Sequence, residues 1–162
     1  WHPEEDGKVK SLAELDAIWH ASVGRGASLL LNVPANRSGR ISDVDAQRLV
    51  DLRHHLDAIE SVDWVRGARV TTDSAGVQVD LPAKRKIDRI LIQGPIAQGQ
   101  RVKTFAVEAR MDGSWREVAR GTTIGRLRVL RFPPCDADAV RIRILSARAR
   151  PMISRVAIFS EG

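Results

Sequence analysis

The chain has 162 residues and a mass of 17.9 kDa, enough for one ordinary domain or a small domain with part of another, so a complete large enzyme is excluded. Hydrophobic residues make up 43% of it, which is sufficient for a core, but its apolar runs are too short to cross a bilayer, and we expect no membrane partner. A single cysteine, Cys135, excludes an internal disulfide framework and a cysteine-based zinc site.

Charge and hydrophobic periodicity both change near residue 61. Residues 1–61 carry 7 basic and 10 acidic side chains, whereas residues 62–162 carry 19 and 10. Two independent changes at one position indicate a boundary better than either alone. We therefore predict one domain over residues 1–61 and a second over residues 62–162, with the linker at about residues 60–67.

The first predicted element is a helix that begins at Ser11. Ser11 and Glu14 have the spacing of a capping box, in which each side chain satisfies a backbone N–H of the other residue. Gly24 and Gly26 provide a helix stop. The residues that recur at intervals of three and four along one face are Leu12, Leu15, Ile18, Trp19, Ser22 and Val23.

A strand and a second helix follow in the first segment. Ser28–Val33 contains three consecutive leucines without alternation, which is typical of a strand covered on both faces in a parallel sheet, and Pro34 ends it. Ser42 caps a predicted helix that continues to about Ile59. The residues expected on its buried side are Val44, Leu49, Leu52, Leu56 and Ile59.

One strand covered on both faces has no partner within this segment, and its buried backbone groups would remain unpaired. We therefore expect the rest of the sheet to lie elsewhere. Residues 1–61 are predicted to be the last helix–strand–helix part of a parallel α/β domain, a (β/α)8-like barrel, whose earlier part is absent from this sequence.

The second segment alternates apolar and polar residues with the period of β-strands and shows no helical pattern. Turn residues such as Gly94–Pro95, Asp112–Gly113 and Pro133–Pro134 separate the strands. This spacing predicts an antiparallel β-sandwich or jelly roll over residues 62–162. The predicted strands centre on residues 77–81, 87–93, 102–111, 115–119, 127–132, 140–144 and 153–159.

The positive charge of the second segment raises a nucleic-acid hypothesis, because Lys and Arg neutralise phosphates. The arginines at 126, 128, 141 and 143 occupy alternating strand positions, which is typical of a solvated outer face, and no aromatic residues are interleaved with them. We therefore expect no nucleic-acid partner.

Few side chains are candidates for chemistry. His54 and His55 are adjacent on a helix and point about 100° apart, the wrong geometry for one metal ion, and His20 is interpreted as a packed helical histidine. His2, beside Trp1, precedes a helix of the predicted α/β unit at the end where such folds bind ligands. The acidic residues 4–6 are interpreted as solvated groups near a helix start, and Cys135 as an inert thiol.

Several stretches resemble one family of enzymes. The run WHPEEDGKVKSLAELDAIWHASVGRGASLLLNVPANRSGRI (1–41) looks like the end of the catalytic barrel of the α-L-fucosidases of glycoside hydrolase family 29. The runs IQGPIAQGQRVKTFAVEA (92–109), GTTIG (121–125) and VRIRILSARARPMISRVAIF (140–159) resemble the galactose-binding-like or discoidin-like β-sandwich that follows that barrel. The resemblance covers nearly the whole chain, in the family's order.

The resemblance implies a retaining exo-glycosidase that removes terminal α-L-fucose from glycans through a covalent intermediate. The family's nucleophile, an Asp, and its acid/base, a Glu, come from earlier barrel strands, so no catalytic residue is expected in this chain. Trp1 stands where the family has an aromatic side chain against the apolar side of fucose, and His2 is its neighbour. Asn32 either faces the site or has a structural turn role.

The resemblance also implies the partners. These are a fucosylated glycan substrate and the upstream barrel of the same protein; a homo-oligomer is left open, and activity outside the cytoplasm is suggested by analogy. Residues 70–76 are shorter than the family's usual acidic insert at this point, so we predict no metal site and no cofactor. The alternative function is a non-catalytic carbohydrate-binding or structural β-sandwich module.

Overall fold

The computed structural model describes residue 4 and residues 8–160. It divides the chain into two compact units, Trp1–Glu60 and Ser61–Gly162. Within the described part of the chain, no helix is both long and apolar enough to cross a membrane.

Helix α1 (Leu12–Ala21) begins with the predicted capping box. The backbone N–H of Ser11 donates to the Glu14 carboxylate at 2.7 Å, and the N–H of Glu14 donates to the Ser11 hydroxyl at 3.3 Å. The helix ends two residues earlier than predicted, because a short 3-10 turn, η2 (Val23–Arg25), follows it and closes at Gly26 with a φ of +82°. That positive φ is the conformation for which glycine is favoured at a helix end.

Helix α2 (Asp43–Glu60) follows the predicted cap, where the N–H of Asp45 donates to the Ser42 hydroxyl at 3.2 Å. Its buried face is narrower than predicted. Leu52 and Ile59 are buried, but Val44 in the first turn is 42% exposed, so the prediction for Val44 was wrong.

Residues 28–33 do not form the predicted strand. Within the described part of this unit, the only β pairing is an isolated bridge between Ala35 and Ile41, and Leu30 is 96% exposed. No strand therefore forms here among the described residues, and the place of this segment in a sheet whose other strands lie elsewhere stays a prediction. The physical reason is that a strand needs a neighbour for its backbone hydrogen bonds, and this unit supplies none among its described residues.

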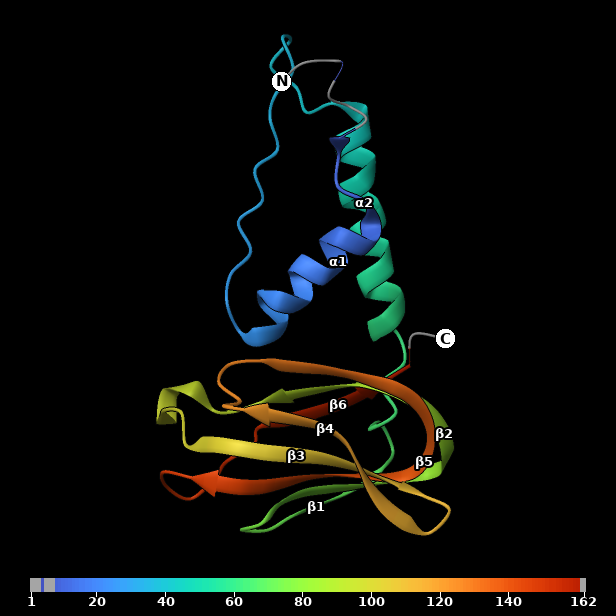
Figure 1. Cartoon of the computed structure of the whole chain (residues 1–162), viewed down its shortest axis with the longest axis vertical. Helices are drawn as coiled ribbons and strands as arrows, with labels where there is room; N and C mark the ends of the chain where they lie inside the picture. Colours follow the sequence, from blue (N-terminus) through green and yellow to red (C-terminus); the bar gives the residue numbers. More distant parts are fainter. Residues whose placement is uncertain (1–3, 5–7, 161–162) are drawn as a thin grey trace. The chain divides into compact units, whose positions relative to one another are not determined.

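The second unit is the predicted antiparallel β-sandwich, with two layers (Figure 1). One layer has the order β1, first half of β2, second half of β5, β3, β4, and in the other layer the second half of β2 pairs with both β6 and the first half of β5. The elements are β1 (Arg69–Thr72), β2 (Gly76–Gln93), η3 (Ile96–Gln98), β3 (Val102–Met111), β4 (Ser114–Thr122), β5 (Arg128–Ala147) and β6 (Arg155–Phe159).

Strands β2 and β5 each join two strands that the sequence predicted as separate. Their pairing is interrupted between Asp80 and Arg85 and between Ile87 and Arg89, where the register shifts and both strands pass from one layer to the other. Pro133 and Pro134, predicted as turn residues, lie inside β5 opposite the second irregularity. Proline donates no ladder hydrogen bond, so a bulge tolerates it where a regular strand would not.

The core lies between the two layers and is aliphatic with three buried phenylalanines. Asp63 helps to close it, because its carboxylate accepts hydrogen bonds from the backbone N–H groups of Val65 at 3.0 Å and Ile158 at 3.1 Å. The largest fully buried side chains are Phe105, Phe159, Ile87, Ile90, Ile92, Ile142, Ile158, Val79, Val107 and Val140.

Gly76 should be required at the start of β2. Its φ is +148°, and a Cβ atom there would lie 1.8 Å from the backbone oxygen of Ile142 on the paired strand. Because backbone cannot move aside cheaply, we expect Gly76→Ala to lower the free energy of unfolding by about 3 kcal/mol or more in urea titrations.

Gly113→Ala is the matched control. Gly113 also has a positive φ, +78°, but nothing lies within 4 Å of a Cβ placed there, so we expect a loss of only about 1 kcal/mol. Equal losses for the two variants would contradict the steric argument.

Candidate functional site

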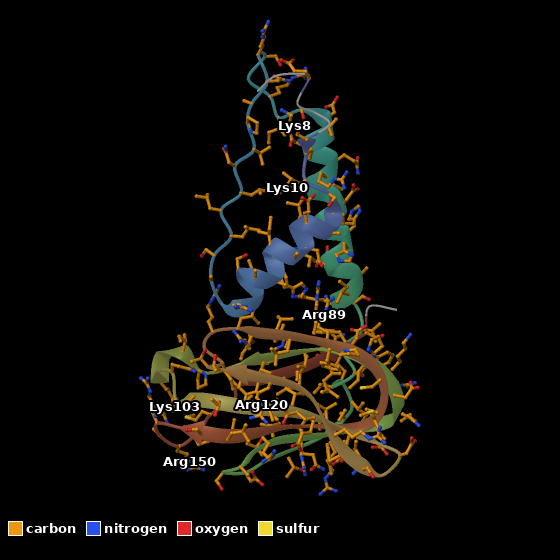
Figure 2. All side chains as sticks on the ribbon, viewed as in Figure 1. Lys8, Lys10, Arg89, Lys103, Arg120 and Arg150 are labelled. Carbon is orange, nitrogen blue, oxygen red and sulfur yellow. The ribbon has the colours of Figure 1, made fainter. Side chains whose placement is uncertain are left out.

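The two residues that the sequence singled out for substrate binding, Trp1 and His2, lie outside the described residues. Their role stays a prediction. Asn32 is described, and it lies in the extended segment of the first unit, beside a hollow of about 290 Å³. The residues that line this hollow are Lys8, Val9, Lys10, Leu15, Leu31, Asn32, Val33, Pro34, Asp45, Arg48 and Leu49, of which Lys8 and Lys10 are labelled in Figure 2.

Two histidines of the first unit converge on one carboxylate. His20 Nε2 on α1 lies 3.5 Å from Asp16 Oδ1, and His55 Nε2 on α2 lies 3.4 Å from the same oxygen. Asp16 is buried, and His20 packs edge-on against Trp19. The cluster therefore forms a polar contact between α1 and α2. This contact fits the packed position predicted for His20. The approach of His55 was not predicted, because it depends on how the two helices cross.

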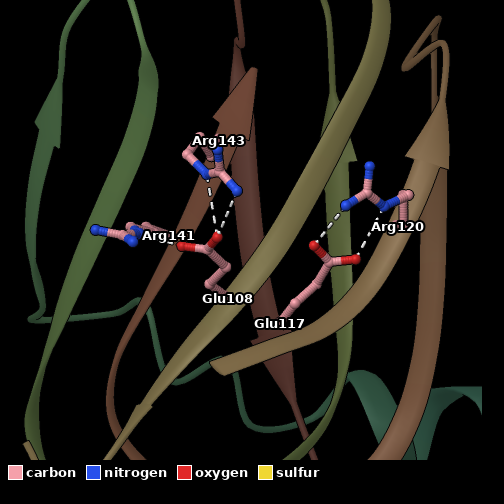
Figure 3. A network of polar contacts seen from close by, with 5 residues as sticks. All are labelled: Glu108, Glu117, Arg120, Arg141 and Arg143. Carbon is pink, nitrogen blue, oxygen red and sulfur yellow. Dashed lines mark hydrogen bonds and ion pairs between the residues drawn. The ribbon is translucent and has the colours of Figure 1, made fainter. Parts of the chain in front are cut away.

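The outer face of the five-stranded layer carries a network centred on Glu108 of β3 (Figure 3). Arg141 on β5 donates through Nε to one carboxylate oxygen at 2.5 Å, and Arg143 donates through Nη2 to the other at 2.9 Å. The Glu108 side chain is only 9% exposed. Burial alone would raise its pKa, but the hydrogen bonds from Arg141 and Arg143 outweigh that effect and hold the pKa below its usual value.

The interpretation of these arginines as a simple solvated face was therefore incomplete. The strand register places Glu108 opposite Arg141 on the neighbouring strand β5. Arg143 is two residues further along β5, so its side chain lies on the same face of the sheet. The only signal in the sequence was the alternation of Arg141 with Arg143; their carboxylate partner is 33 residues from Arg141, and strand pairing had to be known to find it.

The aromatic side chain on this face is covered. The guanidinium of Arg141 lies 4.3 Å from the centre of the Trp115 ring, and that of Arg110 lies 5.6 Å from it. Arg110 is itself held by Asp138 at 2.6 Å and by Asp80 at 3.5 Å. Trp115 is thus engaged in cation–π contacts and is not presented as a bare platform for stacking on a sugar.

A polar hollow of about 460 Å³ adjoins the network over β1, β2 and β5. Its wall combines donors and acceptors, with Arg69, Arg141 and Arg143 beside Asp80 and Gln78. The Gln78 amide donates to Asp80 at 3.0 Å. Such a wall can hydrogen-bond a polar molecule, but its opposing charges favour no single sign of ligand.

Metal binding and thiol chemistry receive no support from the described residues. Residue 4 and residues 8–160 contain no group of three His, Cys, Asp or Glu side chains placed to hold a metal ion, so the expectation of no metal site stays a prediction. Burial raises the pKa of the Cys135 thiol, and the nearby carboxylates of Asp136 and Asp88 raise it further, so the reactive thiolate is disfavoured.

A sandwich in which two long strands are shared between a five-stranded and a three-stranded layer belongs to the discoidin-like class. The chain is a member of the F5/8 type C domain family, whose model matches residues 44–158. The predicted galactose-binding-like or discoidin-like β-sandwich is thereby confirmed.

The relatives of this chain are similar to it over both units. A protein of Oryza sativa subsp. japonica is 32% identical over 100% of the chain, and alpha-L-fucosidase 1 of Arabidopsis thaliana is 30% identical over 99%. The chain spans 37% and 38% of the length of these curated relatives. The predicted resemblance to the C-terminal part of α-L-fucosidases is confirmed.

Solved structures of glycoside hydrolase family 29 are also similar to this chain. A glycoside hydrolase 29 family member from an unknown rumen bacterium is 29% identical, with a TM-score of 0.94 over 100% of this chain and 31% of that chain. A Ruminococcus gnavus GH29 fucosidase, solved in complex with fucose, is 26% identical, with a TM-score of 0.83 over 93% of this chain and 37% of that chain.

Removal of the Glu108 charge should destabilise the sandwich. In Glu108→Gln, two arginines lose their shared counter-ion on a half-buried face, so we expect the free energy of unfolding to fall by about 2 kcal/mol. Glu117→Gln is the matched control. Glu117 pairs with Arg120 at 2.8 Å, but their side chains are 37% and 60% exposed, and we expect a clearly smaller loss, because water screens an exposed ion pair.

The same carboxylate should contribute to acid sensitivity. Because its folded pKa is lowered, its stabilisation is complete above the usual value of 4.5 and is lost as the pH falls through the lower folded value. The stability difference between wild type and Glu108→Gln should therefore shrink below about pH 4.5 in unfolding curves recorded at several pH values. A difference that grows on acidification would contradict this account.

Proposed function

We propose that this chain is the C-terminal part of an α-L-fucosidase, a retaining exo-glycosidase of glycoside hydrolase family 29 that releases terminal α-L-fucose from glycans. One observation carries the proposal. The similarity to alpha-L-fucosidase 1 of Arabidopsis thaliana extends over 99% of the chain and thus includes both units, whereas a shared β-sandwich alone would account only for the second.

The first unit is the closing part of the catalytic barrel in this proposal. Residues 28–33 are extended, and Leu30 is 96% exposed, which is what a strand would show without its neighbouring strands. Barrel strands on either side would pair its backbone groups and cover its leucines. The domain boundary predicted near residue 61 would then separate barrel from sandwich, close to the division between the two compact units at Glu60 and Ser61.

In this proposal, the catalytic carboxylates and the sugar-contacting aromatic residue come from different parts of the protein. Retaining hydrolysis needs a carboxylate nucleophile and a carboxylic acid about 5 Å apart, and it needs no cofactor. By the family resemblance, these groups belong to barrel strands upstream of this chain. Trp1 would lie against the apolar side of the fucose ring, with His2 beside it, so this chain would complete the sugar-binding site without contributing the reacting groups.

The sandwich would support the barrel and would not bind neutral sugars by stacking. Trp115 is the aromatic side chain on its charged face, and two guanidinium groups cover that ring. Sugar-binding sites commonly combine an aromatic surface with convergent polar groups. Among its described residues, the outer face of the five-stranded layer offers no uncovered aromatic surface.

The test is hydrolysis of an aryl α-L-fucoside by the intact protein, with the configuration of the released sugar followed by NMR. We expect α-L-fucose as the first product, because two displacements at the same carbon retain the configuration. No release of fucose, or release of the inverted sugar, would reject the proposal, and a non-catalytic carbohydrate-binding or structural module would then be the better description.

Trp1→Ala should lower kcat/KM of the intact protein for the aryl fucoside by about tenfold, because a stacked aromatic surface contributes on the order of 1 kcal/mol or more. Val70→Ala is the control. Val70 is an exposed apolar residue of β1, so its truncation should leave kcat/KM unchanged. An unaltered kcat/KM for Trp1→Ala would remove Trp1 from the proposed sugar site.

A further inference from the structure

Three loops meet at one end of the sandwich and hold one another in place. They join β2 to β3 (residues 94–101), β4 to β5 (residues 123–127) and β5 to β6 (residues 148–154) (Figure 1). The N–H of Gly94 donates to the oxygen of Gly125 at 2.9 Å, and the N–H of Arg148 donates to the oxygen of Arg101 at 2.7 Å. The N–H of Gly125 donates to the side chain of Gln100 at 3.0 Å, so the loops form one surface.

This end of the sandwich is strongly basic. The stretches 94–103, 120–128 and 146–155, which form the loops and the strand ends beside them, contain no Asp or Glu. Lys103 and Arg150 are labelled at this end in Figure 2. We call the surface the basic pole and define it by Arg101, Lys103, Arg126, Arg148 and Arg150.

The charges of the basic pole are not neutralised by the described part of the chain. Arg101 donates through Nε to the oxygen of Gln98 at 3.2 Å and through Nη1 to the oxygen of Arg150 at 3.3 Å, and both acceptors are uncharged. For Lys103, Arg126, Arg148 and Arg150, no carboxylate of residue 4 or residues 8–160 lies within ion-pair distance, and all four side chains are exposed.

Three acidic side chains of the five-stranded layer and its β1–β2 turn are already engaged within the sandwich. Glu117 is paired with Arg120, and Glu108 is shared by Arg141 and Arg143. Asp73, in the β1–β2 turn, accepts the backbone N–H groups at Ala75 and Gly76. These three carboxylates are held in contacts within the sandwich, and the basic pole is left as a group of like charges, an arrangement that repels itself until an anion binds.

The chemistry of the basic pole selects among anionic partners. A guanidinium fork binds sulfate and carboxylate groups with two hydrogen bonds, and a polymer with repeated anions can engage several of these side chains together. The three stretches contain no Trp, Tyr or Phe, so they offer no platform on which a nucleic-acid base could stack.

We propose that the basic pole binds a sulfated, fucose-containing polysaccharide. The choice of a polysaccharide among polyanions rests on the proposed function, because an enzyme that removes fucose would be retained on its substrate by such a contact. The sulfate groups supply the binding energy, and the interaction depends on charge and not on stacking.

The test is binding of the chain to immobilised fucoidan, a sulfated fucan, at low and high salt. We expect binding that weakens steeply with added salt, since exposed charges are screened over about 10 Å at 0.1 M and about 3 Å at 1 M salt. Chemically desulfated fucoidan should bind at least about tenfold more weakly, because it lacks the sulfate groups to which the guanidinium groups donate hydrogen bonds. Equal binding of the two polymers would overturn the proposal.

Matched charge variants locate the site. Arg148→Gln with Arg150→Gln should weaken fucoidan binding by about tenfold, whereas Lys86→Gln with Arg116→Gln, the same change of charge on exposed residues away from the three loops, should have little effect. Circular dichroism melting of each variant shows whether it is folded. Equal weakening by both pairs would mean that net charge alone, and not the basic pole, causes binding.

Two further probes test the choice of polymer. Binding to duplex DNA, or to phosphatidylserine vesicles, that is as tight as binding to fucoidan at equal salt would overturn the assignment to a polysaccharide. Weaker binding to both would support it. The exposed apolar residues Ile96 and Met152 of this end make the vesicle comparison necessary.

The proposal and the proposed function can fail separately. Arg148→Gln with Arg150→Gln in the intact protein should leave kcat/KM for an uncharged aryl fucoside unchanged and should lower fucose release from fucoidan. Hydrolysis of the aryl fucoside without fucoidan binding would reject the basic pole alone. Sulfate-dependent binding without any hydrolysis would reject the fucosidase assignment and would leave the basic pole as a polyanion site.

Discussion

The sandwich depends on the pairing of β2 with β5, which extends through both of its layers. Gly76 pairs with Arg143 at one end, and Ile92 pairs with Arg128 at the other, so the same two strands hold the five-stranded and three-stranded layers together. The layers can therefore enclose one core without a separate covalent link, which matters in a chain with a single cysteine. The register shifts within this pairing let the strands turn, and they set which side chains face outward on each layer.

The functional surfaces follow from that geometry. On the outer face of the larger layer, register places acidic and basic residues opposite each other, and Glu108 becomes the shared partner of Arg141 and Arg143. At the end of the sandwich, the loops have no strand neighbours to supply carboxylates, so their arginines remain without counter-ions in the described structure. On the outer face of the larger layer, the acidic and basic side chains neutralise each other and stabilise the sandwich. At the loop end, the basic side chains have no such partners among the described residues, so this end is a candidate site for binding an anion.

Local signals in the sequence were reliable where neighbours in the chain decide the structure. The capping residues Ser11 and Ser42 and the alternating strands are examples. The sequence could not separate a turn from a bulge at Pro133 and Pro134, because proline suits both. It could not reveal the partners of Glu108 or the His20–Asp16–His55 cluster, because these contacts join residues on different elements. The role of Trp1 rests on family resemblance alone.

The extended segment 28–33 has a consequence for handling the chain by itself. Its three consecutive leucines lie on a backbone without strand partners among the described residues, and Leu30 is almost fully accessible. Such a segment can pair with the same segment of another molecule, which is how open strand edges lead to aggregation. The net charge of +6 opposes that encounter by repulsion between molecules, and added salt weakens the repulsion. The colloidal stability of the isolated chain would thus be greatest in dilute buffer.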